Sequence, residues 1–280
     1  MPEVREPSLA DAGRYDRKAA AEKRRPRTIG GDAPPIEIAD GRYIARFART
    51  AAEIDGALRL RFEVFNLELG EGLDASYIDG RDEDESDRLC RHLIVVETGT
   101  GAIVGTYRVL TLEAAGAADN FYCAGEFDLS GLPARILAES LEIGRACIAR
   151  EHRHLRVLFL LWRGLAAFAE MQKKRYLFGC CSLTTQDASE GRRAERRLRG
   201  ENCFHPELSV APRADFVCSA EETTNDAKEF ELPKLFGTYL RLGAKVCSPP
   251  AIDRRFKTID FFVLFDIATI DEKYRRMFFA

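Results

Sequence analysis

The chain of 280 residues is long enough to bury a sizeable hydrophobic core, in one large or two small domains. Its 42 basic and 45 acidic residues nearly balance, so the overall field does not favour nucleic acid and we expect no nucleic-acid partner. Eight cysteines without a C-x-x-C pair favour a reducing compartment over a disulfide framework, and we expect no metal site.

Two features of the sequence bear on its location. No apolar segment follows the N-terminal methionine, and no apolar run approaches the ~20 residues that a membrane-spanning helix needs. Residues 1–40 mix charges with proline and glycine, which predicts a flexible N-terminal arm. Its basic cluster KRRPR at 23–27 is either solvated or in contact with anionic lipid. We therefore expect a cytoplasmic protein, with peripheral contact at the inner membrane left open.

The first predicted elements are a strand and a helix. Apolar and polar residues alternate over 43–47, which predicts the strand. Thr50 and Glu53 have the spacing of a capping box, which predicts that a helix begins here. Arg61 lies on the apolar stripe of this helix, which continues to Leu69. A basic residue on such a stripe indicates a pocket residue or a buried ion pair.

An acidic loop and a hairpin follow the helix. The loop DGRDEDESDRLCRH at 79–92 is either a solvated charge run or a site where carboxylates hold the ammonium group of an amine substrate. Residues 92–97 and 102–110, joined by TGTG, predict a β-hairpin. Arg108 lies on a largely apolar face of the second strand, as Arg61 does on its helix.

Residues 137–162 form the most informative stretch: a strand, a loop rich in arginine and histidine, and the start of a long apolar helix. Glu142 and Arg145 lie within the apolar strand, where charges are costly unless they are paired or used. They indicate either an internal ion pair, a strand edge facing water, or a substrate pocket. Strict alternation puts them on opposite faces, and a bulge at Gly144 is expected to bring them to one side.

The remaining pattern completes a mixed α/β domain with one central sheet. It predicts a buried strand at 176–182, a basic helix at 186–198, a long irregular segment at 201–230, a helix at 235–242, a strand at 259–266 and a short helix at 271–278. Such a sheet opens between parallel strands, and ligands bind there. We expect the charges of the apolar elements to converge at that opening, namely Arg61, Arg108, Glu142 and Arg145.

Several segments resemble a known family. They include RLRFEVFNLELG at 59–70, DEDESDRLCRHLIVV at 82–96, LEIGRACI at 141–148 and the run from 232 to 265. The chain resembles the ornithine N-acyltransferases of ornithine-lipid synthesis, which belong to the hemolysin-like acyltransferases of the GNAT superfold. It is similar, more distantly, to the acyl-homoserine-lactone synthases. The resemblance implies a GNAT-like α/β domain over 41–280, with a mixed central sheet flanked by helices and a C-terminal extension from about 200.

The resemblance also implies a reaction: transfer of a (3-hydroxy)fatty acyl group from acyl carrier protein to the α-amine of an amino acid. L-ornithine is the preferred acceptor, the product is a lyso-ornithine lipid, and acyl carrier protein is a co-substrate, so no separate cofactor is expected. Glu142 is the candidate base, with Arg145 beside it as the second catalytic position. Arg108 or Arg145 is expected to pair with the acceptor carboxylate.

The other matched positions are expected to bind substrate. Arg61 and Phe65 match a motif at the pocket entrance, while Asp84 and Asp87 match acidic positions that recognise the amino end of the acceptor in the lactone synthases. Ser86 and Arg91 depart from the family pattern in this region.

The donor is predicted from the loop REHRHLR at 150–156, which has no glycine. Acetyltransferases of this superfold carry a glycine-rich pyrophosphate loop there, through which backbone amides approach the diphosphate of coenzyme A. A carrier-protein donor is therefore favoured, and two groups of arginines could steer an acidic carrier electrostatically: Arg150, Arg153 and Arg156, and Arg192, Arg193 and Arg196. A solvated basic face is the alternative for both groups.

Other functions stay open at this point. A lactone-forming signal synthase would need S-adenosylmethionine, and an N-acyl amino acid synthase would use another acceptor. An O-acyltransferase acting on a lysophospholipid is disfavoured, because His92 is followed five residues later by Glu97 and not by aspartate. A non-enzymatic lipid or protein binder would keep the fold without the chemistry.

Overall fold

The computed structural model describes residues 33–219 and 231–279. Most of the predicted N-terminal arm, with its KRRPR cluster at 23–27, therefore lies outside the described residues. The last residues of the range expected for this arm form β1 (Glu37–Asp40), which pairs with β2 (Tyr43–Phe47) at the edge of the sheet. The short turn between them closes this hairpin at Gly41, whose φ of 59° favours glycine.

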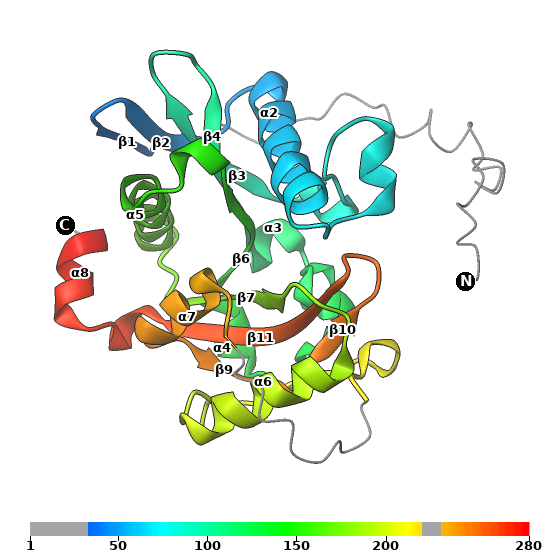
Figure 1. The fold of residues 1–280 in the computed structure, drawn as a ribbon. Coiled ribbons are helices and arrows are strands. Elements are labelled where there is room, and N and C mark those ends of the chain that lie inside the picture. The colour runs from blue at the N-terminus through cyan, green and yellow to red at the C-terminus, as the bar shows by residue number, and fades with distance from the viewer. Residues whose placement is uncertain (1–32, 220–230, 280) are drawn as a thin grey trace, which may run out of the picture.

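A nine-stranded mixed sheet forms the centre of the described chain, in the order β1-β2-β3-β4-β6-β7-β11-β10, with β9 pairing beside β11 (Figure 1). The remaining strands of this sheet are β3 (Arg91–Glu97), β4 (Ile103–Thr111), β6 (Ser140–Ile148), β7 (Tyr176–Leu183), β9 (Lys245–Val246), β10 (Ala251–Asp253) and β11 (Thr258–Asp266). A separate two-stranded sheet pairs β5 (Phe127–Asp128) with β8 (Ala211–Pro212). The predicted hairpin and strands are thus confirmed, with small shifts at their ends.

The sheet opens between β6 and β7. These strands are parallel, and they pair only from Ser140↔Tyr176 to Glu142↔Phe178. On its other side β7 pairs with β11 along its whole length, so the opening lies on the β6 side. At the start of the opening a Cβ atom on Gly179 would lie 2.2 Å from the carbonyl oxygen of Ile143, so the two backbones meet closely before they diverge. The predicted opening between parallel strands is confirmed.

Helices cover both faces of the sheet (Figure 1). They are α2 (Ala51–Arg61), α3 (Leu112–Ala115), α4 (Ala134–Ala138), α5 (Leu155–Met171), α6 (Ala188–Gly200), α7 (Lys234–Arg241) and α8 (Glu272–Phe278). Successive residues of a strand point to opposite faces of the sheet. Leu93, for example, packs in the core beneath α5, and its neighbour Ile94 packs beneath α2. None of the helices within the described ranges is long and apolar enough to cross a membrane.

The first helix begins with the predicted capping box, in which Thr50 and Glu53 cap each other's backbone N–H groups. The spacing of its apolar residues predicts that this helix continues to Leu69, but the α-helix ends at Arg61. After Arg61 it widens into the π-helix η1 (Phe62–Glu68). π-helical turns are rare and often occur at functional sites.

The other short elements are 3₁₀-helices: η2 (Asp74–Ile78), η3 (Glu85–Arg88), η4 (Ala118–Asn120), η5 (Cys123–Gly125), η6 (Leu129–Gly131), η7 (Arg150–His152), η8 (Ala214–Phe216) and η9 (Ile267–Thr269). The acidic loop is therefore partly ordered as η3, and the arginine- and histidine-rich loop contains η7. Of the segment predicted to be irregular at 201–230, residues 220–230 lie outside the described chain.

We predict that Gly179→Ala destabilises the protein by about 1–3 kcal/mol, because the new methyl group would overlap the Ile143 backbone at the start of the opening. Gly144→Ala is the matched control, since a Cβ atom there meets nothing within 4 Å. That variant should be unchanged or more stable by about 0.5–1 kcal/mol. Urea unfolding of the two variants measures the difference, and equal stabilities would contradict the close approach.

Candidate active site

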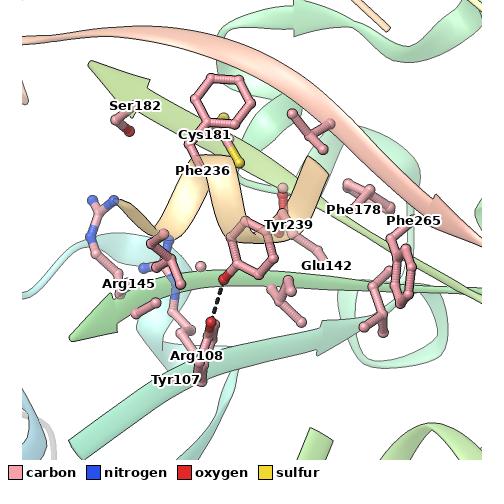
Figure 2. Close-up of a pocket in the computed structure, with 18 of the residues that line it drawn as sticks. Tyr107, Arg108, Glu142, Arg145, Phe178, Cys181, Ser182, Phe236, Tyr239 and Phe265 are labelled. Carbon is pink, nitrogen blue, oxygen red and sulfur yellow. Dashed lines mark hydrogen bonds between the residues drawn. The ribbon is translucent and has the colours of Figure 1, made fainter. Parts of the chain in front are cut away.

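A cavity of about 280 Å³ lies at the opening between β6 and β7. Its apolar wall comes mainly from α5, α7, α8 and β11 and includes Trp162, Leu165, Tyr239, Phe265, Ile270 and Phe278. Its polar wall includes Glu71, Arg108, Tyr122, Glu142, Arg145, Ser182, Thr184 and Asp260. Figure 2 shows Arg145 and Ser182 toward one side and Phe178 and Phe265 toward the other. A ligand with one polar and one long apolar end fits this division.

A β-bulge in β6 brings the two predicted charges to one cavity. Arg108 of β4 pairs with Gly144, whereas Thr106 pairs with Cys147, so β6 has one extra residue in this interval. Arg145 occupies the extra position with a φ of 50°, in the left-handed region that non-glycine residues rarely adopt. The bulge therefore lies one residue later than expected. Glu142 and Arg145 both line the cavity, as the bulge requires.

Six charged side chains at the polar wall and behind it, each at most 13% exposed, form a closed ring in which each arginine bridges two aspartates. We call it the charge ring, and its order is Arg61, Asp82, Arg145, Asp84, Arg108 and Asp87. Arg61 is fully buried at the end of α2, where its Nε donates to Asp82 at 2.8 Å. Its Nη1 and Nη2 donate to the two oxygens of Asp87 at 2.6 and 3.1 Å, in a bidentate pair.

Asp84 closes the other half of the charge ring. Its Oδ1 accepts from Arg108 at 2.6 Å and its Oδ2 accepts from Arg145 at 2.9 Å. The Nε of Arg145 lies 3.2 Å from Asp82, and Nη1 of Arg108 lies 3.4 Å from Asp87. Three positive and three negative groups thus balance inside a buried space, which is the condition under which buried charges are tolerated.

The charge ring alters the role expected for two carboxylates. Burial raises the pKa of Asp87, but Arg61 and Arg108 outweigh burial and hold that pKa well below its ordinary value. For Asp84 burial likewise opposes Arg108 and Arg145, which lower its pKa. Both side chains are therefore ionised and already paired, and neither lines the cavity. This geometry argues against the expectation that Asp84 and Asp87 hold the acceptor ammonium, and places them instead behind Arg108 and Arg145.

Arg61 and Phe65, expected at the pocket entrance, differ in position. Phe65 lines the cavity from η1 and packs edge-on against Phe256, with ring centroids 5.5 Å apart. Arg61 does not line the cavity and belongs to the charge ring. Of the two readings of a basic residue on an apolar stripe, the buried ion pair is confirmed.

Glu142 is held by the backbone of the loop that crosses the polar wall. Its Oε2 accepts from the N–H of Tyr122 at 2.9 Å, and its Oε1 accepts from the N–H of Cys123 at 2.7 Å. The side chain is buried, and burial raises its pKa although these N–H groups and Arg108 favour the charged form. A carboxylate with a raised pKa, fixed in place at a cavity wall, is suited to accept a proton.

Aromatic side chains support both walls. The guanidinium of Arg145 lies 4.0 Å from the ring centroid of Phe256 and 4.6 Å from that of Tyr122. On the apolar side, the hydroxyls of Tyr107 and Tyr239 form a hydrogen bond that joins β4 to α7 (Figure 2). Trp162 of α5 donates to the Tyr107 hydroxyl at 3.3 Å. These contacts fix the cavity between three elements that are distant in the sequence.

The arginines expected to dock a carrier lie outside the cavity in two groups. Arg150, Arg153 and Arg156 are exposed near the start of α5, where Arg153 pairs with Glu68 of η1 and Arg156 lies 3.4 Å from Asp40. In α6, Arg192 and Arg193 pair with Glu195 and Glu190, and Arg196 is exposed. The first group is linked to the cavity wall through η1, which bears both Glu68 and the lining residue Phe65.

Sequence reasoning missed five polar residues of the cavity wall: Glu71, Tyr122, Ser182, Thr184 and Asp260. Asp260 had a usable signal, because it interrupts the apolar strand IDFFVLF as Glu142 interrupts its own strand. Glu71 and Tyr122 had none, since both lie in irregular segments whose position depends on the tertiary fold.

The charge ring makes a prediction about stability. Asp87→Asn leaves Arg61 and Arg108 incompletely paired inside the protein and should cost about 3–5 kcal/mol of folding free energy. Asp55→Asn is the control, because Asp55 pairs with Arg59 and Arg81 at a partly exposed surface and should cost less than about 1 kcal/mol. Urea unfolding compares the two. Similar losses would show that the ring is not a structural constraint.

Comparisons with known proteins show the family of the chain. Residues 60–163, which include the charge ring and β6, match the model of an acetyltransferase (GNAT) domain. The L-ornithine N(alpha)-acyltransferase of Brucella abortus is 32% identical over 84% of this chain and 88% of its own. The enzyme of the same name from Rhizobium meliloti is 33% identical over 82% of this chain and 81% of its own.

Among solved structures, the acyl-homoserine-lactone synthase LasI aligns over 86% of this chain and 96% of its own, at 12% identity and a TM-score of 0.46. FeeM, an N-acyl amino acid synthase from uncultured soil microbes, aligns over 81% and 92%, at 11% identity and a TM-score of 0.44. The sequence relatives establish the family: the chain is an acyltransferase that belongs to the L-ornithine N(alpha)-acyltransferases.

Proposed function

We propose that the protein transfers a (3-hydroxy)fatty acyl group from acyl carrier protein to the α-amine of L-ornithine, giving a lyso-ornithine lipid. The observation that carries the proposal is the divided cavity, which places a buried carboxylate, Glu142, between two arginines and a long apolar wall. The apolar wall suits an acyl chain, and the polar wall suits an amino acid.

The donor enters along the open edge of β6. Residues 143–146 line the cavity beyond the last pair with β7, so their backbone groups face the space where a partner would lie. The amide groups of a phosphopantetheine arm can pair with such an edge as an added strand does. The neighbouring loop has no glycine and forms η7, with His152 and His154 bonded to the Tyr43 hydroxyl at 2.9 and 3.1 Å. These features favour a carrier-protein arm over the diphosphate of coenzyme A.

The chemistry is direct amide formation. The acceptor arrives as an ammonium ion and gives one proton to Glu142, and the free amine attacks the thioester carbonyl carbon. The tetrahedral intermediate expels the thiolate of the phosphopantetheine arm, while the second nitrogen proton passes to sulfur. Backbone N–H groups at the bulge around Arg145 support the developing oxyanion. The products are an amide and a free thiol, so atoms and charge balance without a cofactor.

Arg145 and Arg108 orient the acceptor. Both guanidinium groups line the polar wall and are held from behind by the aspartates of the charge ring. A planar guanidinium presents donors in a fixed fork that matches a carboxylate. The α-carboxylate of ornithine therefore binds here, which leaves its α-amine near Glu142. We place this reaction in the cytoplasm, with peripheral contact at the inner membrane where the lipid product is delivered.

An N-acyl amino acid synthase with a different acceptor is the second candidate function. The polar wall would bind the carboxylate and α-amine of glycine, lysine or glutamine by the same contacts. A lactone-forming synthase would need a site for S-adenosylmethionine, and a panel of acceptors with S-adenosylmethionine included separates the three. A binder without activity would give no product with any acceptor.

We predict that Glu142→Gln lowers kcat by roughly two to four orders of magnitude, because the base is lost. Glu139→Gln is the control, since Glu139 lies three residues earlier and pairs with Arg135 at the surface. The enzyme is incubated with the 3-hydroxyacyl thioester of acyl carrier protein and with L-ornithine, and the N-acyl product is measured by mass spectrometry. Thermal unfolding checks that the loop held by Glu142 remains in place. Turnover of Glu142→Gln close to that of wild type would remove this role.

The pH profile supplies a separate prediction. Glu142 acts as base only when ionised, and burial raises its pKa above the ordinary 4.5. Activity should therefore fall as the pH decreases through this raised pKa, at a higher pH than an exposed glutamate would give. The acid limb of kcat/KM should disappear in Glu142→Gln at its residual rate. An unchanged limb would assign it to another group.

Charge reversal tests the docking of the carrier. Arg150→Glu with Arg153→Glu should raise KM for the acylated carrier about tenfold or more at low salt, because the carrier is acidic. A second variant reverses Arg192, Arg193 and Arg196 and shows whether α6 contributes. An acyl-pantetheine thioester, which lacks the carrier, is the control donor and should be used equally by all. If KM for the carrier is unchanged in both variants, these arginines are a solvated basic face.

A further inference from the structure

Two acidic residues of the cavity wall are not neutralised by the charge ring. Glu71 follows η1 and Asp260 lies in β11, and they are 5% and 3% exposed. The Thr184 hydroxyl donates to Glu71 at 2.5 Å. Asp260 accepts from the hydroxyl of its cross-strand neighbour Ser182 and from that of Thr258, the latter at 2.8 Å. The donors in these hydrogen bonds are neutral hydroxyls, so the carboxyl pair has no directly bonded cation there.

A second acidic layer lies behind Asp260. Carboxylate oxygens of Glu126 and Asp253 approach one another and Asp260 within 4.8 Å. Asp253 is satisfied by the backbone N–H groups of Arg255 and Phe256 at 2.7 and 2.9 Å. Glu126 is 3% exposed, and within the described residues its Oε1 atom has no hydrogen-bond partner. Burial and the charges of Asp260 and Asp253 raise the pKa of Glu126 well above its ordinary value, which favours its neutral form, and the hydrogen bonds of this layer bring no cation to Asp260.

The ionisation of these groups agrees with a missing cation. Burial raises the pKa of Glu71 to about 7, and the nearby charge of Asp260 adds to this effect. Burial also raises the pKa of Asp260 to about 6. Arg145 acts on both carboxyls from a distance but is engaged by Asp82 and Asp84. A cation placed between Glu71 and Asp260 would therefore stabilise their charged forms and be bound in return.

We propose that Glu71 and Asp260, with the hydroxyls of Ser182 and Thr184, form a subsite for the side-chain ammonium group of a dibasic amino acid. This proposal rests on the proposed function and assigns the residues that select its acceptor. Arg145 then binds the α-carboxylate, Glu142 receives the proton of the α-amine, and the carboxyl pair holds the far end of the acceptor. The three contacts fix which amine of the acceptor is acylated.

An ammonium group fits this subsite better than a divalent metal ion. Glu126, Asp253 and Asp260 are the three carboxyls close enough together to hold a metal ion, but of these Asp260 alone lines the cavity. The other polar groups next to Asp260 in the cavity wall are those of Glu71, Ser182 and Thr184. Divalent ions require several carboxylate, carbonyl or water oxygens free for coordination. Both oxygens of Asp260 already accept a hydrogen bond from a hydroxyl group, and the lone pairs that remain can still accept from an N–H donor.

The test compares L-ornithine with L-norvaline, which has the same carbon chain without the terminal amine. Wild type should prefer ornithine by about 100-fold or more in kcat/KM, because norvaline leaves the buried carboxyls unpaired. Glu71→Gln and Asp260→Asn should reduce kcat/KM for ornithine about 10- to 100-fold and that for norvaline by less than about threefold. Glu63→Gln, an exposed change on η1, is the matched control and should alter neither.

The possible outcomes are distinct. The amide variants should fold as well as wild type, because burial already favours the neutral carboxyls, and thermal unfolding checks this. Equal use of ornithine and norvaline by wild type, or equal loss of both in the variants, overturns the subsite. Activity that requires Mg²⁺ or Mn²⁺ and is abolished by a chelator overturns it in favour of a metal site. Absence of N-acyl product from either acceptor in wild type would instead contradict the proposed function.

Discussion

The buried ring of three arginines and three aspartates is the constraint on which the rest of this structure depends. Its members come from the end of α2, the acidic loop, the β-hairpin and the bulge of β6. Because an unpaired charge in the interior costs several kcal/mol, these four segments must arrive together. The ring holds Arg145 in its left-handed conformation and thereby turns two neighbouring charges of β6 toward one cavity. Structure and site are thus joined by the same ion pairs.

The charge ring is neutral overall, and the charged groups of the cavity wall differ in their relation to it. Arg108 and Arg145 can present positive edges to a carboxylate without a net charge accumulating behind them. Within the part of the chain that the structure describes, Glu142 accepts hydrogen bonds from backbone N–H groups and from no arginine, and burial outweighs these N–H groups and the nearby Arg108 to raise its pKa. Elsewhere on the polar wall, burial raises the pKa of Glu71 and of Asp260, and a bound cation would favour their charged forms. An amino acid with a second amine matches this order of charges.

The sequence allowed much of the fold to be predicted, because the long strands and helices have their own periodicity and the first helix its own cap. The capping box at Thr50 and Glu53, the hairpin and the charged strand around Glu142 are local features that a pattern can reveal. The pairing of the charges is not local. A carboxylate can pair with a substrate ammonium group as well as with an arginine, so the sequence does not distinguish the two for Asp84 and Asp87. The tertiary structure shows that arginines pair with both. Glu71 was missed for the same reason, since Thr184, its partner, is 113 residues away.

The position of the new amide bond tests the account most directly. Wild-type protein is incubated with 3-hydroxyacyl carrier protein and L-ornithine, and the product is fragmented in a tandem mass spectrometer to locate the acyl group. The account predicts acylation of the α-nitrogen with the terminal amine left free, because Glu142 and the acidic pair Glu71 and Asp260 lie at different places on the polar wall. Acylation of the terminal nitrogen, or no amide product, would contradict it.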